Sequence, residues 1–155
     1  MLPTGRTDEA GFTLLETVCV VAVIALLAGL IWPRMGAGES RLSLERTAMT
    51  VASTMKADRY ASLREGHEVS TVADLRQREF RSGSSRQVVQ IPAEINLRAT
   101  LSGSCPSSET QALLRFYPDG RSCGGVFTLV RGSEGFEIRI NWLTGGIAVV
   151  PANAL

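Results

Sequence analysis

Residues 17–33 read TVCVVAVIALLAGLIWP and contain no charged side chain. Extended back to Phe12, the apolar run covers residues 12–32 and is interrupted only by Glu16. As an α-helix rising ~1.5 Å per residue, it would be roughly 31 Å long, which matches the hydrocarbon core of a bilayer. A helix that is apolar all round finds little room inside a small domain. The run therefore predicts a membrane-spanning helix.

The rest of the chain is long enough for one modest domain. It has 155 residues in all, of which 45% are hydrophobic and 20% charged, with a formal net charge of +1. This balance argues against a disordered chain and gives no bulk charge for a polyanionic partner. One His and three widely spaced Cys exclude the common His/Cys zinc sites, so no metal and no cofactor are expected.

Residues 1–11, MLPTGRTDEAG, do not resemble an ordinary secretory signal. They carry one Arg and two acidic residues, and no clear A-x-A cleavage site follows the apolar run. Glu16 then has two interpretations. It is a functional carboxylate with a partner, or it marks the headgroup boundary and Thr17 begins the span.

Residues 11–16, GFTLLE, resemble the processing site of type IV pilins and type II secretion pseudopilins. The resemblance implies that a prepilin peptidase cuts between Gly11 and Phe12 and methylates the new N-terminal Phe12. It also implies that Glu16 neutralises the N-terminal amine of a neighbouring subunit and so sets its register in a filament. The leader matches the family in length but lacks its usual surplus of basic residues.

A second helix is expected after Pro33, which either kinks one continuous helix or ends the first. Ser40 is its expected N-cap and Gly66 its C-terminal stop, because apolar residues recur between them at helical spacing. The organisation expected is a leader (1–11), a transmembrane and filament-core helix (12–33), an amphipathic helix (34–66) and a periplasmic β-rich domain (67–155).

Strand-like patterns follow Gly66 and are separated by turn signals such as Pro118-Asp119-Gly120. In residues 136–142, Phe, Ile, Ile and Trp alternate with polar residues, as in a half-buried strand. A long helix followed only by strands predicts an α+β fold, with the helix packed on antiparallel sheet as in pilins. The expected strands are 68–72, 87–91, 95–101, 113–117, 126–130, 136–142 and 147–150.

Two C-terminal motifs narrow the resemblance. Residues 116–125, FYPDGRSCGG, and residues 141–145, NWLTG, resemble the H-type minor pseudopilins of type II secretion. FimT-like minor pilins, which act in pilus assembly or DNA uptake, share much of this pattern and remain the alternative.

The resemblance implies a structural subunit that helps export folded proteins across the outer membrane. The partners implied are the prepilin peptidase, other major and minor pseudopilins, the inner-membrane assembly platform and inner-membrane lipid. The location implied is the bacterial inner membrane, with a single pass, a cytoplasmic N-terminus and a periplasmic C-terminal domain.

Two patterns suggest other chemistry, and both have simpler explanations. Residues 120–124 fit G-x-S-x-G, but that nucleophile motif needs a downstream His, and His67 lies upstream. Cys123 with His67 is another nucleophile pair that nothing else supports, so a Gly-rich turn and no enzyme are expected. Residues 74–86 carry Arg76, Arg78, Arg81 and Arg86, yet Asp74 and Glu79 interrupt them. This favours a solvated polar loop over nucleic-acid binding.

Cys105 and Cys123 lie in Gly/Ser-rich segments of the domain expected to face the oxidising periplasm. A bridge between them would close a loop of about 18 residues and contribute roughly 3 kcal/mol. The alternative is two free thiols too far apart to join. Cys19 lies in the apolar run and is expected to act as an apolar side chain.

Overall fold

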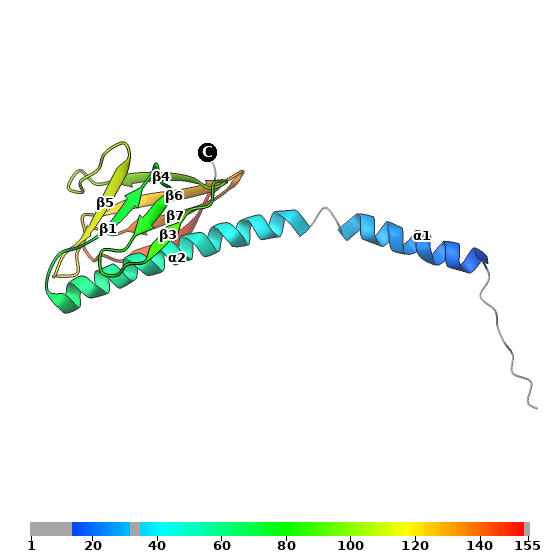
Figure 1. Cartoon of the computed structure of the whole chain (residues 1–155), viewed down its shortest axis with the longest axis horizontal. Coiled ribbons are helices and arrows are strands. Elements are labelled where there is room, and N and C mark those ends of the chain that lie inside the picture. The colour runs from blue at the N-terminus through cyan, green and yellow to red at the C-terminus, as the bar shows by residue number, and fades with distance from the viewer. Residues whose placement is uncertain (1–13, 32–34, 154–155) are drawn as a thin grey trace, which may run out of the picture. The chain divides into compact units, whose positions relative to one another are not determined.

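The computed structural model describes residues 14–31 and 35–153 of the chain (Figure 1). The chain divides into two compact units between Gly38 and Glu39. The first contains α1 (Leu14–Ile31), and α2 (Met35–Glu65) begins before the division and continues in the second. Over the described residues, no helix meets the length and hydropathy that crossing a membrane requires.

The second helix ends where the sequence predicts and begins earlier. Gly66 has a φ of 70° and donates its N–H to the Ser62 carbonyl at 3.1 Å, which confirms it as the C-terminal stop. The prediction that Ser40 caps the helix is wrong, because α2 begins at Met35. Gly36, Gly38 and Ser40 disfavour a helix by at most about 1 kcal/mol each, which does not stop a helix from propagating. The prediction for Pro33 lies outside the described residues.

One face of α2 forms part of the core of the second unit. Its fully buried apolar side chains recur at helical spacing: Leu44, Ala48, Val51, Ala52 and Met55. Leu42 and Met49, on other faces, remain about half exposed. This division makes α2 the amphipathic helix that the sequence predicts.

Eight strands follow α2 and form two antiparallel sheets of four (Figure 1). The first has the order β3-β2-β1-β5 and the second the order β4-β6-β7-β8. Their bounds are β1 (Val69–Asp74), β2 (Glu79–Arg81), β3 (Val88–Gln90), β4 (Asn96–Leu101), β5 (Gln111–Phe116), β6 (Gly125–Arg131), β7 (Glu134–Ile140) and β8 (Ile147–Asn153).

The core joins both sheets to α2. Phe80 of β2 and Phe127 of β6 are fully buried and meet edge to face, with ring centroids 5.2 Å apart. Leu114 of β5 and Ile138 of β7 belong to the same buried cluster as Met55 of α2. The α+β class, with a long helix packed on antiparallel sheets, is confirmed.

Two predictions within the sheets are wrong. The polar stretch 74–86 contains β2, which forms because Phe80 is buried and both β1 and β3 pair with its short backbone. Strand β7 ends at Ile140, so Trp142 lies beyond it and is 62% exposed rather than buried. The other strands occur where predicted, with ends that differ by at most three residues.

Candidate assembly site

Three residues carry the predicted processing and assembly chemistry, and the structure describes one of them. Gly11 and Phe12 lie outside the described residues. Glu16 lies in the first turn of α1, and its side chain is exposed. Thr17 beside it donates its hydroxyl to the Leu14 carbonyl at 2.8 Å. A carboxylate in the first turn of a helix also interacts favourably with the helix dipole.

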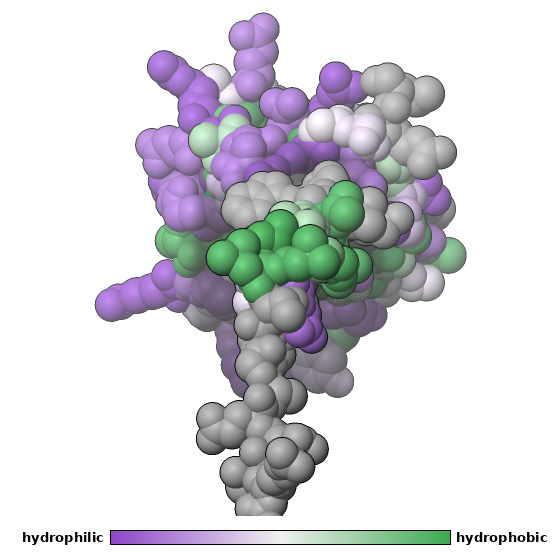
Figure 2. All heavy atoms as spheres, turned by 90° about the vertical axis from the view of Figure 1, so that its right-hand side faces the viewer, coloured by the Kyte–Doolittle hydropathy of each residue, from purple (hydrophilic) through white to green (hydrophobic). Residues whose placement is uncertain are grey.

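The helix that carries Glu16 offers an apolar surface in every direction. All side chains from Leu14 to Ala28 are exposed, and Leu14 and Leu26 are exposed by 83% and 70%. Figure 2 shows the described part of α1 as green, hydrophobic spheres, whereas purple dominates the rest of the visible surface. Burying apolar surface is favourable by about 25 cal/mol per Å². Helix α1 is therefore a surface that gains free energy in apolar surroundings, whether lipid or other helices.

The second unit, Glu39–Leu155, is called the head domain, and it carries a buried carboxylate that the sequence analysis missed. Asp58 on α2 is fully buried and accepts hydrogen bonds from the hydroxyls of Thr71, Ser82 and Ser84, each at 2.6 Å. It also accepts the backbone N–H groups of Gly83 at 3.1 Å and Ser84 at 2.9 Å. Asp58 thus joins α2 to β1 and to the loop between β2 and β3.

The signal for this contact was present but ambiguous. Asp58 lies three residues after Met55 and four before Ser62, on the buried face of α2. A charged residue at a core position of a helix indicates a partner, but it does not say which segment supplies that partner. Gly83 is required in the loop, because a Cβ there would lie 2.3 Å from the Ser70 carbonyl oxygen.

Arg59, next along α2, holds the two C-terminal motifs together. Its Nε donates to the Gly120 carbonyl at 3.1 Å and its Nη2 to the Thr144 carbonyl at 2.8 Å. A Cβ on Gly145 would lie 2.2 Å from the Gly120 oxygen, so the two turns approach as closely as only glycine allows. The motifs 116–125 and 141–145 therefore form one structural unit at the C-terminal end of α2.

The structure joins Cys105 and Cys123 in a disulfide with Cα atoms 5.3 Å apart. Both residues are buried, and the bridge ties the loop after β4 to the segment before β6. Cys19 of α1 is free and exposed. The bridge is the pairing that the sequence left open against two free thiols.

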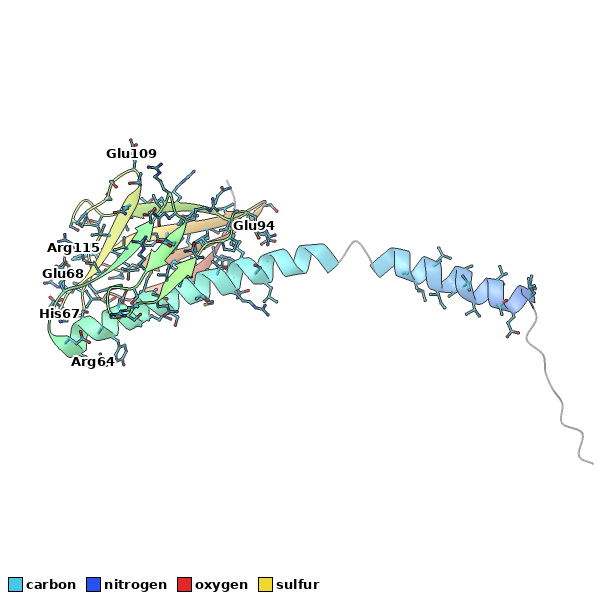
Figure 3. The ribbon with its side chains drawn as sticks, in the orientation of Figure 1. Arg64, His67, Glu68, Glu94, Glu109 and Arg115 are labelled. Carbon is cyan, nitrogen blue, oxygen red and sulfur yellow. A yellow bond between two sulfur atoms is a disulfide. The ribbon has the colours of Figure 1, made fainter. Side chains whose placement is uncertain are left out.

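The arrangement does not form a nucleophilic site. Ser122 is buried and donates its hydroxyl to the Asn141 carbonyl at 3.2 Å, while Cys123 is in the disulfide. The side chain of His67 is 61% exposed just after α2, and its Nε2 lies 3.6 Å from Glu65 (Figure 3). Across the described residues, no three or more His, Cys, Asp or Glu side chains gather as a metal site would require.

The basic stretch 74–86 is partly used within the fold. The Arg78 guanidinium donates to the Pro92 carbonyl at 2.9 Å and also to the Ile95 carbonyl. Arg81 pairs with Glu79 and donates to the Gln77 side chain. Two of the four Arg side chains in the stretch, Arg78 and Arg81, therefore have partners within the fold.

Two carboxylates, the buried Asp74 and the exposed Asp119, have lowered pKa values. The backbone N–H of Gln77 and the side-chain amide of Gln111 stabilise the charged form of Asp74 and lower its pKa. The backbone N–H and the guanidinium of Arg121 lower the pKa of Asp119 in the same way. Both groups are therefore ionised at neutral pH.

Comparison with known proteins agrees with this architecture. The prokaryotic N-terminal methylation motif matches residues 6–32. The type II secretion system protein H of Xanthomonas campestris is 25% identical over 149 residues, covering 96% of this chain and 88% of that protein.

The structure of the minor pseudopilin EpsH from the type 2 secretion system of Vibrio cholerae superposes with a TM-score of 0.55. The superposition covers 69% of this chain and 95% of EpsH, at 9% identity, and shows a shared fold. The chain resembles a minor pseudopilin of the type II secretion system.

Minor pseudopilins are structural subunits and not enzymes. In this chain the methylation motif overlaps α1 and includes Glu16, whereas the buried core lies in the head domain. The predicted family and its general function are confirmed. The individual roles of Gly11, Phe12 and Glu16 remain predictions.

Proposed function

We propose that residues 12–33 anchor this pseudopilin in the bacterial inner membrane, with a single pass, a cytoplasmic N-terminus and a periplasmic head. The prepilin peptidase removes residues 1–11 and methylates Phe12. The mature subunit then joins major and minor pseudopilins at the inner-membrane assembly platform, in a filament that helps export folded proteins. The observation that carries the proposal is the methylation motif at 6–32, which runs into an apolar helix with Glu16 in its first turn.

The role of Glu16 follows from its spacing and surroundings. It stands four residues after Phe12, which is about one helical turn. Opposite charges attract more strongly in a low-dielectric environment than in water, so a neighbour's N-terminal amine and Glu16 form a directional contact. Apolar contacts along α1 contribute most of the area buried between neighbouring subunits, but they are not directional. The charge pair therefore sets the axial position of one subunit against the next.

A pair of substitutions in α1 tests the assembly step. Glu16→Ala is expected to be inserted and cut, because a neutral side chain makes the helix easier to insert, but to lose its crosslinks to partner pseudopilins. The matched control is Thr17→Ala, an exposed neighbour whose hydroxyl bonds only within the first turn. Wild-type crosslinking and secretion by the Glu16→Ala subunit would contradict the proposal.

The processing step has its own measurement. Intact mass of the protein from native membranes is expected to give a chain that begins at Phe12 and carries one methyl group. Replacing Gly11 by a bulky residue is expected to leave the precursor uncut, because the peptidase must approach the backbone closely there. A chain that still begins at Met1 in wild-type cells would refute processing without bearing on the fold.

A further inference from the structure

Trp142 is a large aromatic residue that the head domain holds at its surface. It follows β7 and is 62% exposed. Its neighbour Leu143 is 55% exposed. Trp142 and Leu143 together expose a contiguous apolar patch, so what holds the segment in place is informative.

The segment that carries Trp142 is held from several directions. The Asn141 side-chain oxygen accepts the N–H groups of Leu143 at 2.9 Å and Thr144 at 3.0 Å, and its carbonyl accepts that of Gly145 at 2.9 Å. The Trp142 carbonyl accepts the N–H of Ser122 at 3.1 Å. Together with the Arg59 bond to the Thr144 carbonyl, these contacts fix the backbone from which the indole projects.

The surface beside Trp142 is hollowed and combines aromatic with planar polar groups. The hollow has a volume of about 360 Å³ and is lined by Tyr117, Pro118, Asp119, Arg121, Ser122 and Trp142. The Arg121 Nε donates to Asp119 at 2.6 Å, and the two side chains are 55% and 49% exposed. Asp119 also accepts the Arg121 backbone N–H at 3.0 Å, so this charged pair is oriented before any ligand arrives.

We propose that this hollow binds the pyranose ring of a glycan. The C–H groups on one face of a sugar ring carry a small positive charge that matches the negative face of an indole ring. The ring hydroxyls both donate and accept, and the Asp119–Arg121 pair supplies an acceptor and a donor side by side. Trp142 is the platform for the ring, and Asp119 and Arg121 bind its hydroxyls.

The composition of the hollow favours a sugar over a protein side chain. The core of a protein interface is enriched in aromatic residues but depleted of charged residues such as Asp. Here the charged pair remains half exposed next to the indole, which suits a ligand with both apolar and hydroxyl-bearing faces. The site lies in the head domain, so it is independent of the assembly role proposed for Glu16.

The test measures binding of two trisaccharides to the full chain in a detergent without a sugar headgroup. Chitotriose and maltotriose are each titrated while saturation-transfer NMR follows their ring protons. Transfer from the protein to either sugar, at millimolar concentration or below, is the expected result. Binding of chitotriose alone identifies an amino-sugar glycan as the source, and binding of both identifies a general pyranose site.

Matched substitutions locate the binding. Trp142→Ala is expected to weaken it at least about tenfold, and Asp119→Asn and Arg121→Gln by roughly tenfold each. Leu143→Ala is the control, because Leu143 is exposed on the same turn but does not line the hollow. The proposal is overturned if neither sugar receives transfer, or if Leu143→Ala weakens binding as much as Trp142→Ala. Unchanged circular dichroism of each variant shows that it is folded.

Discussion

Replacing Asp58 by Ala is the most informative perturbation of the head domain. The substitution leaves five hydrogen-bond donors without their acceptor, all of which lie within 3.1 Å of the carboxylate. The donors come from β1 and from the loop between β2 and β3, whereas Asp58 belongs to α2. We therefore expect the contact between helix and sheet to weaken at this point.

The size of the loss follows from the exposure of each donor. The Thr71 side chain is 1% exposed, and a buried donor without a partner costs about 1–3 kcal/mol. The loop donors can bond to water instead, because Gly83 and Ser84 are exposed. For these donors together we therefore count the loss of one hydrogen bond to a charged group, worth roughly 1.5–3 kcal/mol. The expected decrease in the free energy of unfolding is about 2.5–6 kcal/mol, a large share of the ~5–15 kcal/mol typical of a domain.

Urea unfolding of the full chain in detergent, followed by near-UV circular dichroism, measures this loss. Glu109→Ala is the control, because Glu109 is an exposed acidic residue in the loop before β5 (Figure 3). Thr71→Val completes a double-mutant cycle, in which we expect coupling with Asp58→Ala. A decrease below about 1 kcal/mol, or additive effects of the two substitutions, would refute the reasoning.

Three further outcomes are expected. Asp74→Asn is expected to destabilise the protein at neutral pH and to have a smaller effect as pH falls. The pKa of Asp74 lies below the ordinary 3.8, and its stabilising effect disappears once the folded carboxyl is protonated. Urea midpoints of both proteins across acidic pH test this, and a pH-independent difference would contradict it. Thiol labelling of the unreduced protein is expected to modify Cys19 and spare Cys105 and Cys123, whereas labelling of all three would argue against the bridge. Gly83→Ala is expected to lower the unfolding midpoint because its Cβ would meet a β1 carbonyl oxygen at 2.3 Å, while Gly103→Ala, which has open space, serves as the control.

Sequence patterns predicted the elements whose signal is local. The apolar run of α1, the helical spacing of Leu44 to Met55 and the stop at Gly66 depend on residues within a few turns of one another. The alternation in β7 likewise identified a strand with one buried face. The same alternation placed the end of the strand too late, at Trp142. It does not reveal that the Asn141 side chain accepts the N–H groups of Leu143 and Thr144 and so forms a turn there.

The sequence patterns did not predict the contacts between distant segments. The short strand β2 looked like a charged loop because its stability comes from β1 and β3 on either side and from burial of Phe80. Arg78 looked like a solvated side chain because its partners, the carbonyls of Pro92 and Ile95, lie on another segment. Asp58 was not singled out, since nothing near it in sequence provides its donors.

The sequence by itself determined the apolar segment, the motif at 11–16 and the α+β class, because each depends on composition or on a period of a few residues. The tertiary structure alone decided that Asp58 joins α2 to the sheet, that Arg59 unites the two C-terminal motifs and that Trp142 faces solvent beside a polar pair. These contacts bring together residues separated by 13 to 85 positions. Hydrophobic periodicity indicates which face of an element is buried, but only the packed chain specifies what that face meets.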